Sequence, residues 1–419
     1  MPSQDIIESQ SCGAQEQSQG ILIPLDLPEF EILCQEIQAD GSIWVQVKAV
    51  TDRQRCPRCG SICVKVHDTR ARVKKDRTLG THGVWLIVLK RRFRCFTCQR
   101  PFTEADQACG CYKRSTKRLR EHLALQAQKS PIAQIAHEAG VGPRFVQECF
   151  AASMEERLVR QGRSIDESSM LPTPRFLGID EFAHRKGHHY DTILCDLEQR
   201  TVLEVSAGHK LEDVQKLLER LENPDEVEAV SMDMSASFRP AVQLCLPKAQ
   251  IVVDHFHVIQ HVMKAVKKIV SSWAHKKEGK PLLEGKQHLF LKAQEDLTEA
   301  QAQERREIGG ELPLLEAAWQ LKEALRTWYA TSTVETAAAG LDAWIEQVQA
   351  SECDPLRKTL SAFVKWRQEI LAFFQFLPTR ISNGFVEGKN NRTKALMRQA
   401  YGYRNRQHLR LRILLGNAL

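Results

Sequence analysis

The chain has 419 residues, which is more than one ordinary hydrophobic core can organise, so we expect about two to four domains. Lysine and arginine number 59 against 52 acidic residues, a formal charge of +7, and their uneven clustering favours a polyanionic partner. No stretch reaches the roughly twenty apolar residues of a membrane span, and the polar start of the sequence excludes a secretory signal peptide. We therefore expect a cytoplasmic protein without membrane partners.

The first domain after the start of the sequence is expected to be rich in strands. Residues 1–20 are polar and aperiodic, which predicts a disordered tail. Within residues 21–112, the runs FEILCQEIQ and SIWVQVKAV read as two strands joined by a turn over residues 39–42. The run GVWLIVLKRRFRC predicts a further strand that ends in alternating basic and aromatic residues.

Two CxxC pairs in this domain predict one structural Zn²⁺. Each pair can bind one side of a tetrahedral ion, and four thiolates leave no open position for catalysis. The alternative, a redox dithiol, requires one CxxC opening a helix and does not suit two matched pairs in strand-rich sequence. The expected ligands are Cys56, Cys59, Cys95 and Cys98. Three further thiols, whose part in binding stays open, are Cys63, Cys109 and Cys111.

A helix-turn-helix is expected within residues 113–160. The segment from Pro131 to Gln147 has apolar residues at helix spacing on both sides of Gly140, which supplies the turn. The second helix of such a unit lies in the major groove of DNA and would present Arg144 and Gln147. Any short helical hairpin can mimic this pattern. Residues 161–174 are rich in Ser and Pro and predict a linker.

The rest of the chain predicts an α/β domain interrupted by helices. Residues 175–263 alternate as βββαβαβ, the order in which an RNase H-like mixed sheet with flanking helices begins. Residues 264–377 are almost entirely helical in pattern, which predicts an all-α region. Residues 378–419 predict one amphipathic helix, expected to belong to the α/β domain, and a basic tail.

Three carboxylates are candidates for a divalent-cation site. Asp180 and Asp233 each end a predicted buried strand, so their side chains can share cations as phosphoryl transfer requires. Glu387 opens the final helix and can reach the same place. Two Mg²⁺ ions, or Mn²⁺ in their place, are the expected cofactors. Asp254 and His257 are expected to orient neighbouring groups rather than to bind the ions directly. For any isolated Asp, a helix cap or a solvent-facing role is the usual alternative.

At these residues the sequence resembles the ISL-three family of bacterial insertion-sequence transposases. The strings that carry the resemblance are LGIDEFAHRKGHHY from Leu177, DMS from Asp233, DHFH from Asp254, SNGFVEGKN from Ser382 and YGYRN from Tyr401. The resemblance implies a DDE triad of Asp180, Asp233 and Glu387 on an RNase H-like core, with the helical stretch as an insertion. Glu387 depends on the resemblance more than the two aspartates do.

The resemblance implies a transposase that binds terminal inverted repeats and target DNA, associates with the nucleoid, and hydrolyses and transfers DNA strands. Acting on two element ends implies a homodimer or a larger synaptic complex. The alternative is a non-catalytic DNA-binding regulator derived from a transposase. Besides Arg144 and Gln147, the residues expected to contact DNA are Lys389, Arg392, Lys394, Arg398, Arg404 and Arg406.

Overall fold

The computed structural model describes residues 25–185, 189–399, 403 and 405–415. The chain divides after Gly162 into two compact units, here called unit 1 and unit 2. The expected disordered tail over residues 1–20 and the DNA-binding candidate Arg404 lie outside the described residues. Within the described ranges, no helix combines the length and the apolarity that a bilayer span requires.

Unit 1 begins with a five-stranded sheet in the order β1-β2-β6-β5, with β7 paired to β6. The expected hairpin is confirmed: β1 and β2 pair antiparallel around Gly41, whose φ of +78° suits glycine. Alternate residues of β2 and β6 are buried and form the core of the sheet. The strands are β1 Phe30–Ile37, β2 Ile43–Ala49, β5 Val66–Lys75, β6 Val84–Arg94 and β7 Pro101–Thr103, and the short pair is β3 Gln54–Arg55 with β4 Ile62–Cys63.

Helices complete unit 1. They are α2 Lys117–Gln126, α3 Ile132–Glu138 and α4 Pro143–Arg160. Gly140 has a φ of +58° between α3 and α4, as expected for the turn residue. The inward side chains of α3 and α4 include Ile135 and Val146, which are buried. Helices α3 and α4 are thus joined by a short turn at Gly140, and α2 packs on α4.

Unit 2 is built on a second five-stranded sheet in the order β10-β9-β8-β11-β12. The three strands β8 to β10 are antiparallel, and β11 and β12 run parallel to β8. The order of elements is βββαβαβ, as the sequence predicts. The elements are β8 Phe176–Arg185, β9 His189–Asp196, β10 Thr201–Ala207, α5 Leu211–Leu218, β11 Ala229–Met232, α6 Phe238–Cys245 and β12 Gln250–Val253.

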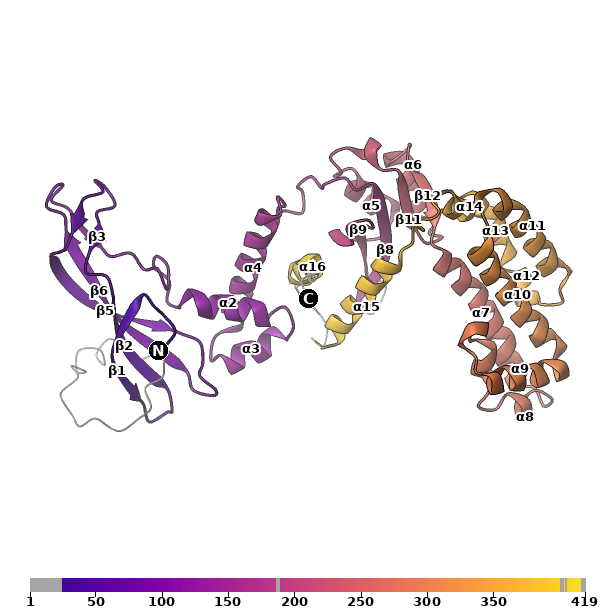
Figure 1. Cartoon of the computed structure of the whole chain (residues 1–419), viewed down its shortest axis with the longest axis horizontal. Helices are drawn as coiled ribbons and strands as arrows, with labels where there is room; N and C mark the ends of the chain where they lie inside the picture. Colours follow the sequence, from indigo (N-terminus) through magenta and orange to yellow (C-terminus); the bar gives the residue numbers. More distant parts are fainter. Residues whose placement is uncertain (1–24, 186–188, 400–402, 404, 416–419) are drawn as a thin grey trace. The chain divides into compact units, whose positions relative to one another are not determined.

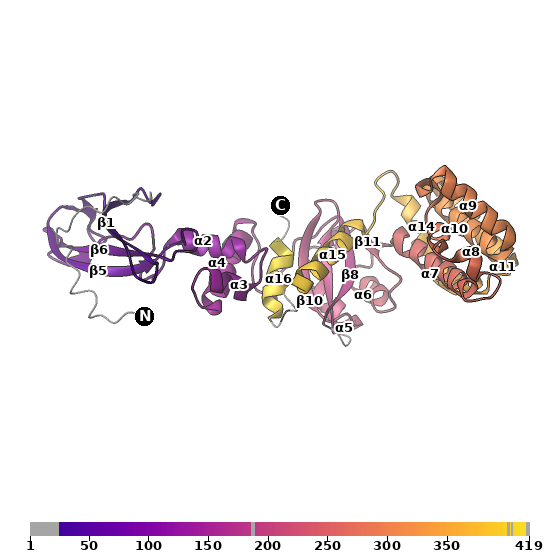
Figure 2. The ribbon, with the colours of Figure 1, turned by 90° about the horizontal axis from the view of Figure 1, so that it is seen from below.

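Helices cover both faces of this sheet, which explains why β11 is buried along its whole length and β9 along most of it. Helices α5 and α6 pack on one face, while α15 Gly384–Gln399 lies along β8 and α16 Arg406–Leu415 lies against β10 (Figures 1 and 2). The segment between β12 and α15 supplies only helices within its described residues. Unit 2 is therefore a mixed α/β body with a helical region inserted before its last two helices.

The helical region begins earlier than the sequence predicts. Helix α7 runs without a break over His255–Ala274, so the expected boundary at residue 264 falls inside it. Four tryptophans of the region are buried in its core, including Trp328 and Trp344. The remaining α-helices are α8 Lys280–Leu283, α9 Glu299–Glu311, α10 Pro313–Thr331, α11 Val334–Ala350, α12 Asp354–Arg357, α13 Leu360–Lys365 and α14 Arg367–Gln375.

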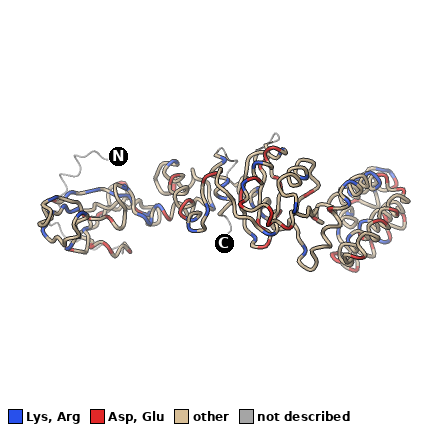
Figure 3. The backbone as a smooth tube through the Cα atoms, turned by 90° about the horizontal axis from the view of Figure 1, so that it is seen from above, with Lys and Arg blue, Asp and Glu red and all other residues tan. Residues whose placement is uncertain are grey.

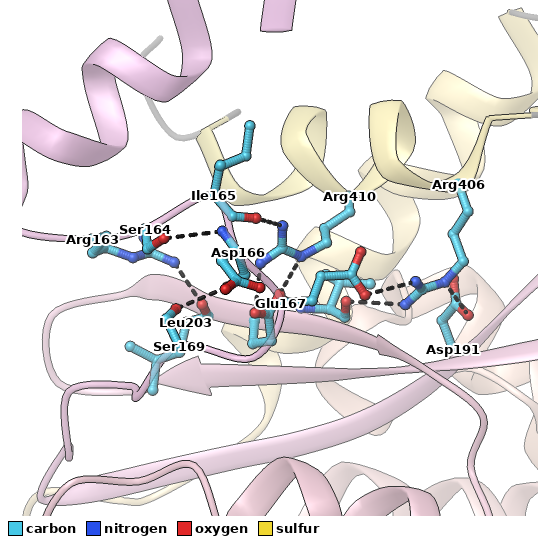
Figure 4. Close-up of polar contacts among 12 residues, drawn as sticks. Arg163, Ser164, Ile165, Asp166, Glu167, Ser169, Asp191, Leu203, Arg406 and Arg410 are labelled. Atoms are coloured by element: carbon cyan, nitrogen blue, oxygen red, sulfur yellow. Dashed lines mark hydrogen bonds and ion pairs between the residues drawn. The ribbon is translucent and has the colours of Figure 1, made fainter. Parts of the chain in front are cut away.

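The predicted linker and the predicted basic tail differ from what the structure shows. Where a basic tail was expected, α16 packs on β10, because Leu409 and Ile413 alternate with its arginines. Arg410 of α16 is 2 % exposed and donates to the carbonyl of Ile165 in the linker at 2.9 Å. Figure 4 shows these contacts between α16 and the segment before β8. The segment predicted as a linker is therefore part of unit 2 from residue 163 onward.

Candidate functional site

The four predicted zinc ligands meet at one point of unit 1. The ligand atoms of Cys56, Cys59, Cys95 and Cys98 all lie within 4.8 Å of one another. The sulfur of Cys56 is 3.6 Å from that of Cys98, and the sulfur of Cys59 is 3.5 Å from that of Cys95. A tetrahedral Zn²⁺ with thiolate bonds near 2.3 Å would separate its sulfurs by about 3.8 Å, so the cluster fits the ion.

The backbone of each CxxC pair favours the thiolate form of the first cysteine in the pair, whereas the pKa of Cys98 is raised to about 11. The backbone N–H of Cys98 hydrogen-bonds the sulfur of Cys95 and lowers the pKa of that thiol to about 6. In the first pair, the backbone N–H of Cys59 likewise lowers the pKa of Cys56. Thiolates are the form that binds zinc. Of the other thiols, Cys63 is buried beside the cluster, Cys109 is buried elsewhere, and Cys111 is exposed.

In unit 2, three aspartates lie in one row across neighbouring parallel strands. Gly178 of β8 pairs with Ser231 of β11, and Met232 of β11 pairs with Val253 of β12. Continuing these registers by one or two residues places Asp180, Asp233 and Asp254 side by side. The expectation that Asp180 ends its strand is wrong: β8 continues to Arg185, because β9 pairs along its whole length. Asp180 instead lies where the pairing with β11 has stopped.

The surroundings of Asp180 and Asp233 disfavour the charged form of both carboxyl groups. Burial and the neighbouring Asp233 raise the pKa of Asp180 to about 6. Burial also raises the pKa of Asp233, although the nearby His257 opposes this shift. The Oδ1 atom of Asp233 is buried without a hydrogen-bond partner. A divalent cation would satisfy this oxygen and stabilise both anions, so the pair fits a metal ion of the Mg²⁺ type.

Hydrogen bonds from two asparagines join the start of α15 to β8 next to Asp180. The side-chain amide of Asn390 donates to Oδ2 of Asp180 at 2.7 Å, and that of Asn383 donates to the carbonyl of Ile179 at 3.0 Å. Gly178 allows this close approach, since a Cβ at this position would lie 2.8 Å from the side chain of Val386 and 2.6 Å from that of Leu197. Both asparagines are almost fully buried. Asn383 directly precedes α15 and Asn390 lies seven residues further on, two turns along, so both face β8 from the same side.

Glu387 lies in the first turn of α15, one turn before Asn390, and its side chain is half-buried. Residues three apart share a side of a helix, so Glu387 is on the side that meets Asp180. Among the described residues, the cysteine cluster is the one group of three or more possible ligands whose ligand atoms all lie within 4.8 Å. Asp180 and Asp233 are therefore neighbours, Glu387 lies on the side of α15 that carries Asn390, and the three carboxylates are not a closed ligand set.

Asp254 connects the row of three aspartates, here called the acidic row, to the start of α15 and to α7 by hydrogen bonds. Its Oδ1 accepts from the backbone N–H of Asn383 at 3.2 Å, and its Oδ2 lies 3.2 Å from Nδ1 of His257. Burial would raise the pKa of Asp254, but hydrogen bonds with His255 and His257 lower it below its ordinary value. The same hydrogen bond to Asp254 raises the pKa of His257. Asp254 thus remains ionised and holds the segment that carries Glu387.

The predicted DNA-binding residues are found in different surroundings. Arg144 and Gln147 are exposed on α4, and Arg144 pairs with Glu148 at 3.0 Å. On α15, Lys389 is half-buried above the ring of Phe385. Arg406 is engaged inside unit 2, where it pairs with Asp191 and Glu167 at 3.3 and 3.2 Å (Figure 4). The exposed basic residues of α15 are Arg392, Lys394 and Arg398.

Sequence reasoning missed several residues that build the site. Asn383 and Asn390 stand in the string that identifies Glu387, and their spacing of seven residues signals a shared helix face. Nothing in the sequence pairs Glu204 of β10 with Arg410, which lie far apart along the chain and yet meet at 2.6 Å. Such a pair depends on the packing of α16, which the expectation of a basic tail did not include.

Comparisons with known proteins agree on one family. The sequence profile of the ISL-three transposase family, described as "Transposase", matches residues 177–413, which is more than half of the chain. The transposase for insertion sequence element IS1001 of Bordetella parapertussis is 28 % identical over 377 residues, covering 88 % of this chain and 90 % of that protein. The transposase for insertion sequence element IS1557 of Mycobacterium tuberculosis is 26 % identical over 262 residues, covering 56 % and 58 %.

Proposed function

The chain belongs to the ISL-three family of transposases, and from this premise we propose that it cuts and joins DNA at Asp180, Asp233 and Glu387. The observation that carries the proposal is the row of aspartates across β8 and β11, with α15 fastened to Asp180 through Asn390. Carboxylates that converge from two parallel strands and a helix are suited to divalent cations that act on phosphodiesters. The strand order β10-β9-β8-β11-β12 with α-helices on both faces supports an RNase H-like core.

In this proposal Asp180, Asp233 and Glu387 would hold two Mg²⁺ ions, or Mn²⁺ ions. When bound, such ions activate an attacking oxygen and stabilise the leaving oxygen of an in-line displacement at phosphorus. The unpartnered Oδ1 of Asp233 and the raised pKa of Asp180 support this role, because both groups gain from a nearby positive charge. Asn390 orients the Asp180 carboxylate, and Asp254 positions the start of α15.

Unit 1 would supply DNA recognition. We assign α3 and α4 to the terminal inverted repeats, with Arg144 and Gln147 toward the bases, and the cysteine cluster to one structural Zn²⁺. The exposed basic residues of α15 would contact phosphates of the donor or target strand. A homodimer or larger complex would bring two element ends together. Arg406 is left out of this assignment, because its guanidinium is engaged with Asp191 and Glu167.

The test is Mg²⁺-dependent cleavage of DNA that carries the ends of the element, taken from the sequence flanking its gene. Wild-type protein should cut, and Asp233→Asn should bind the same DNA and cut only at background level. Asp225→Asn is the matched control, because Asp225 is an exposed aspartate that pairs with Lys248 on the surface of the same unit.

Two results would contradict the proposal in different ways. If Asp233→Asn cuts as fast as wild type, the site assignment is wrong. If wild type binds the DNA but never cuts it in Mg²⁺ or Mn²⁺, the non-catalytic regulator becomes the better description. Normal cleavage by Asp225→Asn is required before the loss in Asp233→Asn is attributed to the site.

A further inference from the structure

A basic pocket of about 550 Å³ lies along α7, the helix that begins at the acidic row. It is formed by one face of α7 together with the segment that joins α12 to α13. Its lining includes four lysines and two further polar side chains, namely Lys264, Lys267, Lys268, Lys358, His261 and Thr359. Neither the sequence motifs nor the proposed chemistry accounts for this group of cations.

The lysines of this pocket have no acidic counterpart. Lys264, Lys267, Lys268 and Lys358 are all exposed, and within the described part of the chain no ion pair is found for any of them. None of the described residues that line the pocket is acidic. Burial together with Lys264 and Lys268 lowers the pKa of His261, which shows how closely these cations converge. Elsewhere along the helical region, basic and acidic residues are interspersed (Figure 3).

The pocket is continuous with the acidic row. His257, His261, Lys264 and Lys268 follow one another at intervals of three or four residues, so they form a single stripe on α7. At 1.5 Å per residue the stripe is roughly 16 Å long. Its near end reaches the site, since Nδ1 of His257 lies 3.2 Å from Oδ2 of Asp254.

We propose that this pocket binds the sugar-phosphate backbone of the DNA segment that leads away from the acidic row. The inference rests on the proposed function, because it takes DNA to be the substrate at Asp233. Duplex DNA carries one charge for about each 1.7 Å of its axis, so a stripe of this length faces several phosphates. Lysines bind phosphates as point charges without reading sequence. Among the described lining residues, only His261 has an aromatic ring, so the pocket lacks the aromatic platform on which an unpaired base would stack.

The experiment measures binding of the full chain to a linear DNA duplex over a series of KCl concentrations, without divalent cations. The pocket variant is Lys264→Ala, Lys268→Ala and Lys358→Ala combined. The control variant, Lys216→Ala, Lys248→Ala and Lys277→Ala combined, also removes three positive charges but lies outside the pocket. The pocket variant should bind more weakly, and its slope of log K against log [KCl] should be shallower by about 2.7, or about 0.9 for each lost phosphate contact. The control should retain the wild-type slope.

A second measurement locates the contact. Lysine acetylation followed by mass spectrometry should show that DNA protects Lys264, Lys267, Lys268 and Lys358, and leaves Lys216 and Lys277 reactive. Equal slopes for the pocket and control variants, or equal reactivity of the pocket lysines with and without DNA, would overturn the inference. Inorganic pyrophosphate that protects these lysines while DNA does not would overturn it as well.

These outcomes are separate from the test of the proposed function. The binding experiment contains no Mg²⁺, so it is independent of strand cleavage. If the pocket variant loses binding while wild type does not cut DNA, the backbone site stands and the proposed chemistry fails. If wild type cuts and the pocket variant binds like the control, the proposed function stands and the pocket has another role.

Discussion

At the scale of single residues, the ionised form of Asp180 lowers the stability of the folded protein. Its carboxylate is buried, lies beside Asp233 and has a pKa of about 6, against an ordinary value of 3.8. Between these two values the folded protein retains a proton that the unfolded chain has already released. Stability therefore falls as pH rises from about 4 to about 6, and the full penalty is present above that window.

Replacing this carboxylate should remove the penalty. In metal-free protein at pH 7, Asp180→Asn is expected to raise the free energy of unfolding by about 3 kcal/mol, the equivalent of its pKa shift. Near pH 3 the gain should largely disappear, because most of wild-type Asp180 is then protonated in both the folded and the unfolded state. Urea unfolding in EDTA at the two pH values measures the difference. An Asn variant whose advantage is the same at both pH values would show that the carboxylate charge is not its cause.

The sequence predicts the residues of the site better than their arrangement. Strand ends and spacing identify Asp180 and Asp233 as candidates, but the extension of β8 beyond Asp180 depends on pairing with β9, which is a tertiary contact. The amide of Asn390 is polar and unremarkable in a helix pattern. Its role becomes visible only when α15 lies along β8, which no local rule determines.

At the scale of elements, α16 is held by a buried ion pair. Glu204 of β10 accepts from Nε of Arg410 at 2.6 Å and from Nη2 of Arg220 at 2.8 Å. Burial would raise the pKa of Glu204, but Arg410 and Arg220 together lower it below its ordinary value. Removing one partner of such a pair leaves the other charge buried without full compensation.

We expect Arg410→Leu to lower the free energy of unfolding by about 3 kcal/mol, because a second arginine still bonds to Glu204. Adding Glu204→Gln should recover part of the loss, since the uncompensated charge is then gone. The control Arg306→Leu, on the exposed side of α9, should change stability by less than about 0.5 kcal/mol. Urea denaturation of the single and double variants measures the coupling. Additive losses in the double variant would contradict the pairing.

Regular elements were the most predictable part of the fold. The alternation in β2 and β6 and the apolar runs of β11 and β12 have clear periodicities, and these strands are confirmed. The segment of α16 shows what periodicity misses. Its arginines made the pattern read as a basic tail, whereas Arg410 is buried because Glu204 and the carbonyl of Ile165 satisfy it.

At the scale of the whole molecule, the chain has two compact units with separate cores, divided after Gly162. The cysteine cluster belongs to unit 1 alone. Structural zinc contributes directly to the stability of the domain that binds it. The two units should therefore respond differently to removal of the metal.

Purified protein is expected to contain about one zinc per chain, and a strong chelator should lower the melting temperature of unit 1 while leaving that of unit 2 unchanged. Calorimetry and zinc analysis measure both quantities. Cys59→Ser should reproduce the effect of the chelator, whereas Cys111→Ser, which removes an exposed thiol outside the cluster, should retain the metal. A zinc content unaffected by Cys59→Ser would exclude this cluster as the site.

The order of elements in unit 2 has a consequence for synthesis. The ribosome makes β8 and β11 long before α15, because the whole helical region lies between them. Unit 1 and the aspartates can therefore emerge and fold while Glu387 has not yet been translated. A nonsense mutation anywhere in the helical region would leave unit 1 whole and remove the third carboxylate. On the proposed function, we expect such a shortened product to occupy element ends without cutting them, and so to compete with the full-length chain.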